Sequence, residues 1–255
     1  MKISKFQALV YSCFNIVEGV INVRRVVIFS LVLLATIYFA ANYAVYYDCT
    51  PDYRTSLLIS NLSDEKAYFR VTVFDSSGQR LWRETYNKPP YSSVFIDLSQ
   101  VVKRSESSWG LVLVQCDELL HITVMYWEEE GTLLNSNHVI EPLNFSQDAK
   151  YYWYAVGYVN SENSQPALIL ANPNDKSIDV AVWIYDEAGQ LVKDLEGELD
   201  PFSAVYVNLV KYVQQGSGVV DIRSTLPILV AVEHYDDGML WNINNIVDWY
   251  TTTSW

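Results

Sequence analysis

Cysteine is scarce in this 255-residue sequence, and Cys13, Cys49 and Cys116 are too few for a disulfide framework. Short catalytic motifs are also missing: there is no G-x-S-x-G turn, no H-E-x-x-H pair, no phosphate-binding glycine loop and no C-x-x-C. We therefore expect no enzyme, no metal and no cofactor. Cys49 and Cys116 both follow the longest apolar run, so they either pair in an oxidising compartment or remain small core residues.

Basic residues are few, since 17 Lys and Arg against 30 Asp and Glu give a net charge of −13. Residues 1–25 carry a net charge of +3, which leaves −16 on the rest of the chain. An acidic body repels phosphate backbones, so we predict no nucleic-acid partner. We interpret the acidic segments 128–130 and 236–237 as solvated turns instead of calcium sites. The three histidines are far apart in the sequence, which argues against a shared zinc site.

The longest apolar run, residues 26–41, contains no charged residue, proline or glycine. We predict a single transmembrane helix over residues 26–42, with Arg24 and Arg25 reaching the headgroups. Basic residues before the span and an acidic body after it place residues 1–25 in the cytoplasm and the remainder outside it. The 25-residue segment before the run is too long for a typical cleaved signal peptide. That segment is patterned as an amphipathic helix, which lies in the membrane interface, packs on a partner's membrane helix, or is a frayed tail.

No long helical pattern follows the apolar run, and the sequence instead repeats itself. The stretch LLISNLSDEKAYFRVTVFDSSGQRL, which begins at Leu57, matches LILANPNDKSIDVAVWIYDEAGQLV, which begins at Leu168. Pairs of matching residues lie 111 positions apart, among them Asn61 and Asn172, Asp75 and Asp186, Gly78 and Gly189, and the turns Pro90-Tyr91-Ser92 and Pro201-Phe202-Ser203. So many matches at one offset indicate a duplicated structural unit.

Each copy has the pattern of β-structure. Apolar and polar residues alternate with period two over residues 68–74 and 178–185, which is typical of strands with two distinct faces. The sequences Asp-Ser-Ser-Gly at 75–78 and Asp-Glu-Ala-Gly at 186–189 predict the turn of a hairpin. We predict an all-β protein with two tandem antiparallel β-sandwich domains, residues 43–145 and 146–255, of six or seven strands each.

The second copy carries short motifs that resemble a known family. It opens with Trp153-Tyr154-Ala155-Val156-Gly157-Tyr158, continues through Asn172-Pro173-Asn174, and closes with Pro227-Ile228-Leu229-Val230. This pattern resembles the β-sandwich family of the sensory rhodopsin transducer and related bacterial or archaeal surface modules. Val156 stands where that opening carries Glu. The resemblance implies a non-enzymatic binding or signalling sandwich in which oligomerisation is common.

Aromatic residues gather in the second copy and beyond its last expected strand. We predict a binding surface that includes Trp153, Tyr154, Trp241, Trp249, Tyr250 and Trp255. The alternatives are a sandwich core or a seam between domains. We interpret the protein as a membrane-anchored, extracytoplasmic interaction protein that binds another envelope or membrane-complex protein or associates with itself. The alternative function is a carbohydrate-binding surface module, which a shallow aromatic platform with flanking Asp and Asn would favour over a flat apolar patch.

Overall fold

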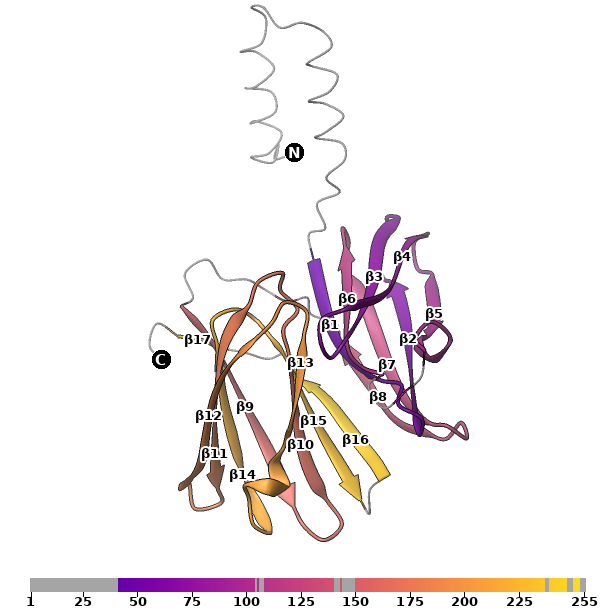
Figure 1. The fold of residues 1–255 in the computed structure, drawn as a ribbon. Coiled ribbons are helices and arrows are strands. Elements are labelled where there is room, and N and C mark those ends of the chain that lie inside the picture. The colour runs from indigo at the N-terminus through magenta and orange to yellow at the C-terminus, as the bar shows by residue number, and fades with distance from the viewer. Residues whose placement is uncertain are drawn as a thin grey trace, which may run out of the picture. The chain divides into compact units, whose positions relative to one another are not determined.

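The computed structural model describes residues 41–103, 105, 108–139, 143, 150–236, 239–246 and 250–252. These residues form β-strands arranged in four sheets, with two single-turn 3-10 helices (Figure 1). The prediction of an all-β fold built from β-sandwiches is therefore confirmed. Within the described ranges, no helix is long and apolar enough to cross a membrane. Residues 1–40, which include nearly all of the expected membrane segment, lie outside these ranges.

The first repeat contains two antiparallel four-stranded sheets. Sheet A has the strand order β1-β6-β3-β4, and sheet B has the order β5-β2-β7-β8. A 3-10 helix, η1 (Leu98–Gln100), follows β5. The strands are β1 (Ala41–Asp48), β2 (Tyr53–Asn61), β3 (Ala67–Asp75), β4 (Arg80–Lys88), β5 (Ser93–Asp97), β6 (Trp109–Cys116), β7 (Leu120–Glu128) and β8 (Leu133–Val139).

The second repeat has the same strand order. Sheet C, with the order β12-β11-β14-β9-β17, corresponds to sheet A, and sheet D, with the order β13-β10-β15-β16, corresponds to sheet B. Its 3-10 helix is η2 (Leu209–Lys211). The strands are β9 (Tyr151–Asn160), β10 (Gln165–Ala171), β11 (Ile178–Asp186), β12 (Leu191–Leu199), β13 (Ala204–Asn208), β14 (Gly216–Ser224), β15 (Leu229–Asp236), β16 (Met239–Ile246) and β17 (Tyr250–Thr252).

The repeats contain more strands than the six or seven expected from the sequence. Strand β8 reads LLNSNHV and does not alternate cleanly, so its sequence gives little indication of a strand. Strand β1 begins at Ala41, so the last two residues of the expected membrane segment 26–42 belong to the first sheet. Tyr43, the residue after the expected membrane segment, is fully buried, and its hydroxyl accepts the Leu120 N–H at 3.0 Å.

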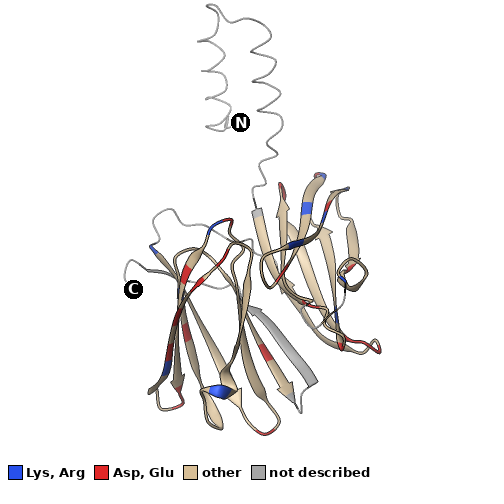
Figure 2. Ribbon diagram, viewed as in Figure 1, with Lys and Arg blue, Asp and Glu red and all other residues tan. Residues whose placement is uncertain are grey.

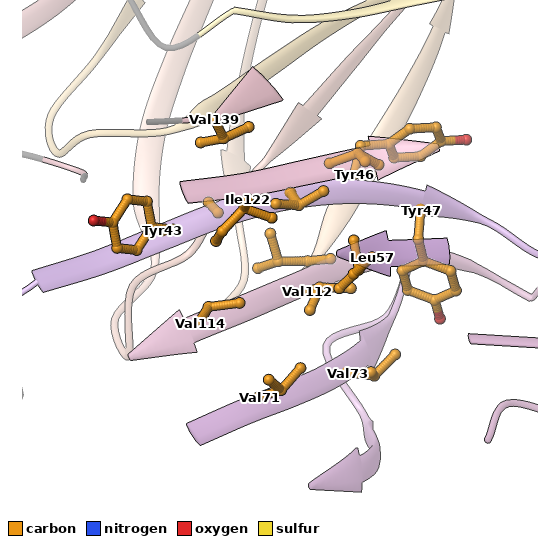
Figure 3. Close-up of a cluster of buried hydrophobic side chains, with 14 of the residues drawn as sticks. Tyr43, Tyr46, Tyr47, Leu57, Val71, Val73, Val112, Val114, Ile122 and Val139 are labelled. Carbon is orange, nitrogen blue, oxygen red and sulfur yellow. The ribbon is translucent and has the colours of Figure 1, made fainter. Parts of the chain in front are cut away.

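The core of each repeat lies between its two sheets. In the first repeat it contains Leu57 and Ile59 from one sheet and Val71 and Val73 from the other, with Tyr43 and Tyr47 beside them (Figure 3). Period-two alternation places these side chains on the inward side of their strands. Burial of this apolar area is the main favourable term for each sandwich.

One buried asparagine in each repeat ties three segments together. The Asn172 amide nitrogen donates to the carbonyl oxygens of Lys176, Leu199 and Asp200 at 2.8, 3.1 and 3.0 Å. Asn61, 111 positions earlier, donates to the carbonyls of the equivalent residues Glu65, Lys88 and Pro89 at 2.8, 3.4 and 3.1 Å. The repeat seen in the sequence is thus also present in individual hydrogen bonds.

Cys49 and Cys116 are both buried and do not form a disulfide. Strand β6 pairs with β1 so that Cys116 lies opposite Ala41, whereas Cys49 follows the other end of β1 and donates its N–H to the Ser108 carbonyl. Seven or eight residues of strand separate the two thiols, which is roughly 25 Å. A disulfide needs α-carbons within about 7 Å, so these cysteines cannot pair in this fold.

Replacing Asn172 by Ala should destabilise the protein by about 2–4 kcal/mol, because three backbone carbonyl groups each lose a hydrogen bond from one buried amide. Chemical denaturation of the full chain would measure this loss. The exposed Gln190→Ala is the control and should change stability by less than about 0.5 kcal/mol. Equal stabilities for the two variants would contradict the importance of the asparagine.

Candidate functional site

The outward sides of sheets A and D are packed against each other. Tyr46, Leu111 and Phe74 point outward from sheet A, yet all three are buried. Buried side chains of sheet D belong to the same apolar cluster as the core of the first repeat: Ile169, Ala171, Ala204, Leu229 and Ala231. The rings of Phe74 and Phe202 stack at 4.4 Å between centroids, with an interplanar angle of 8°. The Ala204 N–H donates to the Ser76 carbonyl at 2.9 Å.

A carboxyl group, Glu233, is fully buried in this A–D interface. The Tyr235 hydroxyl donates to its Oε2 at 2.7 Å, while its Oε1 has no hydrogen-bond partner among the described residues. Burial, together with the nearby Asp48, raises the pKa of Glu233 to about 8, although the hydrogen bond from Tyr235 acts in the opposite direction. The hydroxyl groups of Tyr46 and Tyr206 are also electrostatically coupled to Glu233. Glu233 is therefore largely protonated at neutral pH.

Stability should fall as the pH rises from about 4.5 to about 8, because the unfolded chain releases the Glu233 proton while the folded chain keeps it. Glu233→Gln should remove this pH dependence and raise the free energy of unfolding at pH 8 by roughly a few kcal/mol. Urea denaturation of both proteins across this range would measure the difference, with the exposed Asp179→Asn as control. A wild-type curve parallel to that of Glu233→Gln would contradict a raised pKa.

The outward side of sheet C corresponds to the buried outward side of sheet A, but it is open in the described chain. Trp153, Val159 and Val219 are exposed there. Small residues lie between them: Ala155 and Gly157 on β9, and Ala181 on β11. Along the free edge, β12 places Asp194, Glu196 and Glu198 opposite the outward residues of β11 (Figure 2). This surface has an aromatic and aliphatic centre with an acidic border.

A polar cluster lies near the middle of this surface. The Arg223 guanidinium is 3.4 Å from an Asp221 carboxylate oxygen and covers the Trp183 ring at 5.0 Å from its centroid. Burial raises the pKa of Asp221, and this effect outweighs the neighbouring Arg223 charge and a hydrogen bond from Trp153, which lower it. Arg223 Nε is buried and has no hydrogen-bond partner among the described residues. These groups are held in place by one another.

A hollow of about 470 Å³ adjoins this surface at one end of sheet C. It lies between the β11–β12 turn and the start of β14, and its lining residues are Tyr185, Asp186, Glu187, Gly189, Ser217, Gly218 and Val219. The turn itself is rigid, because Asp186 Oδ1 accepts the N–H groups of Ala188 and Gln190 at 3.0 and 2.8 Å. The hollow is therefore formed by the fold itself, without a bound ligand.

The structure separates the residues predicted to bind. Trp153 lies on the open side of sheet C, as expected of a surface residue, whereas Tyr154 points into the core and receives the Ile228 N–H on its hydroxyl at 2.8 Å. The Tyr154 ring is therefore not available to a ligand. Trp241 belongs to β16, and Tyr250 pairs with Trp153 through β17, so this part of the C-terminal segment folds back on the second repeat. Trp249 and Trp255 lie outside the described residues.

The sequence analysis missed Trp183, Asp221 and Arg223. Alternation along β11 marks Trp183 as an outward residue, which was the available signal. The other two come from β14, and only the pairing of β14 with β11 brings them to Trp183.

The histidines do not form a metal site. The rings of His121 and His138 stack at 5.0 Å between centroids, whereas His234 contacts Ser164 at 3.1 Å in the other repeat. Within the described ranges, no group of three or more His, Cys, Asp or Glu could hold a metal ion.

No protein-family model matches the sequence, and the search of curated proteins found no match. Solved structures with similar chain traces include a lectin from Pleurotus ostreatus, which is 10% identical with a TM-score of 0.26 over 84% of this chain and 77% of the lectin. The exported protein XepA of PBSX is 9% identical, with a TM-score of 0.21 over 75% of this chain and 82% of XepA. A glycosyl hydrolase family 2 member from Bacteroides cellulosilyticus is 11% identical, with a TM-score of 0.18 over 80% of this chain and 28% of the hydrolase. Such distant likenesses carry no functional argument.

Proposed function

We propose that this chain is a membrane-anchored interaction protein that binds a protein partner of the envelope or of a membrane complex through the outward side of sheet C. The observation that carries the proposal is that equivalent sheet surfaces of the two repeats differ in burial. In the first repeat this surface is buried against another sandwich, and in the second it is open. A surface already used for sheet-on-sheet packing within the chain is suited to the same kind of packing with another protein.

The composition of the open surface supports a protein partner. Tryptophan, tyrosine and arginine dominate the energetics of protein interfaces, and this surface presents Trp153, Trp183, Tyr185 and Arg223. The Asp221–Arg223 pair is held by its neighbours before binding, so little side-chain entropy remains to be lost there. The acidic border on β12 favours a partner with basic groups facing it.

Carbohydrate binding is the second candidate. It is favoured by Trp153 and Trp183 on the two strands that flank the Asp221–Arg223 pair of β14, because sugars stack on aromatic rings and bond to paired charged groups. Competition by soluble oligosaccharides would support this candidate, whereas a partner that resists them supports a protein interface.

Val159→Asp should reduce partner binding at least tenfold, because it places a charge in the apolar centre of the surface. The control is Leu62→Asp, since Leu62 is exposed to a similar extent, 55% against 51%, but lies in the first repeat. Each variant would be purified in mild detergent from the native source, and the proteins that copurify would be quantified. Equal recovery with both variants would contradict a role for this surface.

The membrane anchor in this proposal rests on the charge pattern around residues 26–42. Protease added to intact cells should digest residues 43–255 and spare residues 1–25, as detected with tags at each end. Permeabilised cells are the control, in which both ends should be digested. Protection of the C-terminal tag in intact cells would overturn the orientation.

A further inference from the structure

One turn of the second repeat packs against a site on the first repeat, formed by Phe74 and Gly78, which we call the seat. The turn Pro201-Phe202-Ser203, between β12 and β13, places Phe202 on Phe74, next to the β3–β4 turn of residues 75–78. A side chain at Gly78 would collide with the Pro201 carbonyl, so the seat is filled. Phe202 has a φ of 59°, a left-handed conformation that is rare for a bulky residue and directs its ring out of the turn.

The equivalent seat in the second repeat is empty. The hollow at the end of sheet C is formed by the counterparts of the first seat, because Tyr185 corresponds to Phe74 and Gly189 to Gly78. At Gly189 a side chain would meet nothing within 4 Å, in contrast to Gly78. The hollow thus has the position of a seat whose occupant is not part of the described chain.

The first repeat carries the equivalent turn, and it is not seated. Pro90-Tyr91-Ser92 corresponds to Pro201-Phe202-Ser203, and Tyr91 has the same left-handed conformation, with a φ of 53°. The same bond shapes both turns, because Ser92 Oγ donates to the Pro89 carbonyl at 2.8 Å and Ser203 Oγ to the Asp200 carbonyl at 2.9 Å. Tyr91 is 75% exposed, the highest value among the large apolar side chains described. A bulky, exposed ring held in this rare conformation indicates that it contacts another surface.

The residues around the empty seat are more apolar than their counterparts in the closed A–D interface. The charged residues of the A–D interface, Asp48 and Glu233, have Val159 and Met125 as their counterparts on the open sides of sheets C and B. Val159 is exposed, as are two further counterparts of interface residues: Val219 for Leu111 and Phe95 for Tyr206. Both open surfaces therefore retain apolar groups where the closed interface has its contacts.

We propose that the partner of this surface is a second copy of the chain, whose Tyr91 turn occupies the hollow beside Tyr185. This inference rests on the proposed function, because it names the protein that covers the outward side of sheet C. In this arrangement Tyr91 stacks on Tyr185 as Phe202 does on Phe74, and the Ser93 N–H faces the Glu187 carbonyl as the Ala204 N–H does that of Ser76. The contact is head-to-tail, so an assembly of any length keeps a free turn at one end and a free seat at the other, and it grows with concentration.

The test uses the full chain in detergent, with mass measured by light scattering over a range of concentrations. The wild type should grow in mass, and Tyr91→Ser should need at least tenfold higher concentration for the same mass. Tyr68→Ser is the control, since Tyr68 is also exposed in the first repeat but is not in the turn. Any association through residues 1–40 is shared by all variants and forms the baseline. A wild type that stays at baseline, or a Tyr91→Ser that matches it, would overturn the proposal.

A mixing experiment tests the head-to-tail geometry. Ser217→Trp fills the hollow but keeps the Tyr91 turn, and Tyr91→Ser keeps the hollow but lacks the ring. At a concentration where the wild type associates, each variant alone should stay at baseline, and an equal mixture should form one mixed pair and nothing larger. Failure of the mixture to pair would overturn the proposal, provided that thermal unfolding shows Ser217→Trp to be folded.

If Ser217→Trp does not fold, a crosslink replaces it. With Cys13 changed to Ser and Tyr91 kept, Ser93→Cys and Glu187→Cys together should give a ladder of disulfide-linked chains, and either alone should not. Absence of the ladder would refute the contact. If Val159→Asp loses a different copurifying protein while the Tyr91 variants behave like the wild type, the proposed function stands and self-association falls.

Discussion

The buried side-chain amides of Asn61 and Asn172 are the constraint on which the rest of each repeat depends. Each one fixes the end of a central strand, the loop after it, and the chain just before the Pro-aromatic-Ser turn. Backbone carbonyl groups of three segments are hydrogen-bonded to one amide at this point, where the chain crosses from one sheet to the other. The left-handed Tyr91 and Phe202 follow within three residues of the bonded carbonyls and are shaped by this anchoring.

The two repeats use the same local structure with different outcomes. Phe202 contacts Phe74 within the chain, whereas Tyr91 has an exposed ring. Only a few residues account for the difference, because the strand order, the asparagine bonds and the turn geometry are common to both repeats. The closed interface contains a buried carboxyl group, Glu233, whereas the equivalent residue of the first repeat is the uncharged Met125. A buried ionisable group with a fixed neighbour inside one chain carries a smaller penalty than the same group in an interface between separate molecules, which loses its hydration again at each association.

Much of the fold could be predicted from the sequence, because the constant offset and the period-two alternation are local signals. The strand of residues 178–186 and the turns at Gly78 and Gly189 follow directly from them. Alternation alone also separates Trp153 from the buried Tyr154, a distinction that grouping the aromatics together obscured. The sequence could not show that Cys49 and Cys116 lie at opposite ends of a strand pair, or that Asp221 and Arg223 meet Trp183. Both depend on strand register, which is set by distant parts of the chain.

The pairing of β17 with β9 has a consequence for aggregation. Without β17, strand β9 would be an open sheet edge with a full row of unpaired backbone groups, a ready template for strand addition by another molecule. Strand β17 covers β9 over residues 151–153, and at the opposite edge of sheet C the free strand is β12, which Asp194, Glu196 and Glu198 protect by like-charge repulsion. That protection is electrostatic and is screened by salt, so edge-to-edge association of this chain is a hazard of high ionic strength.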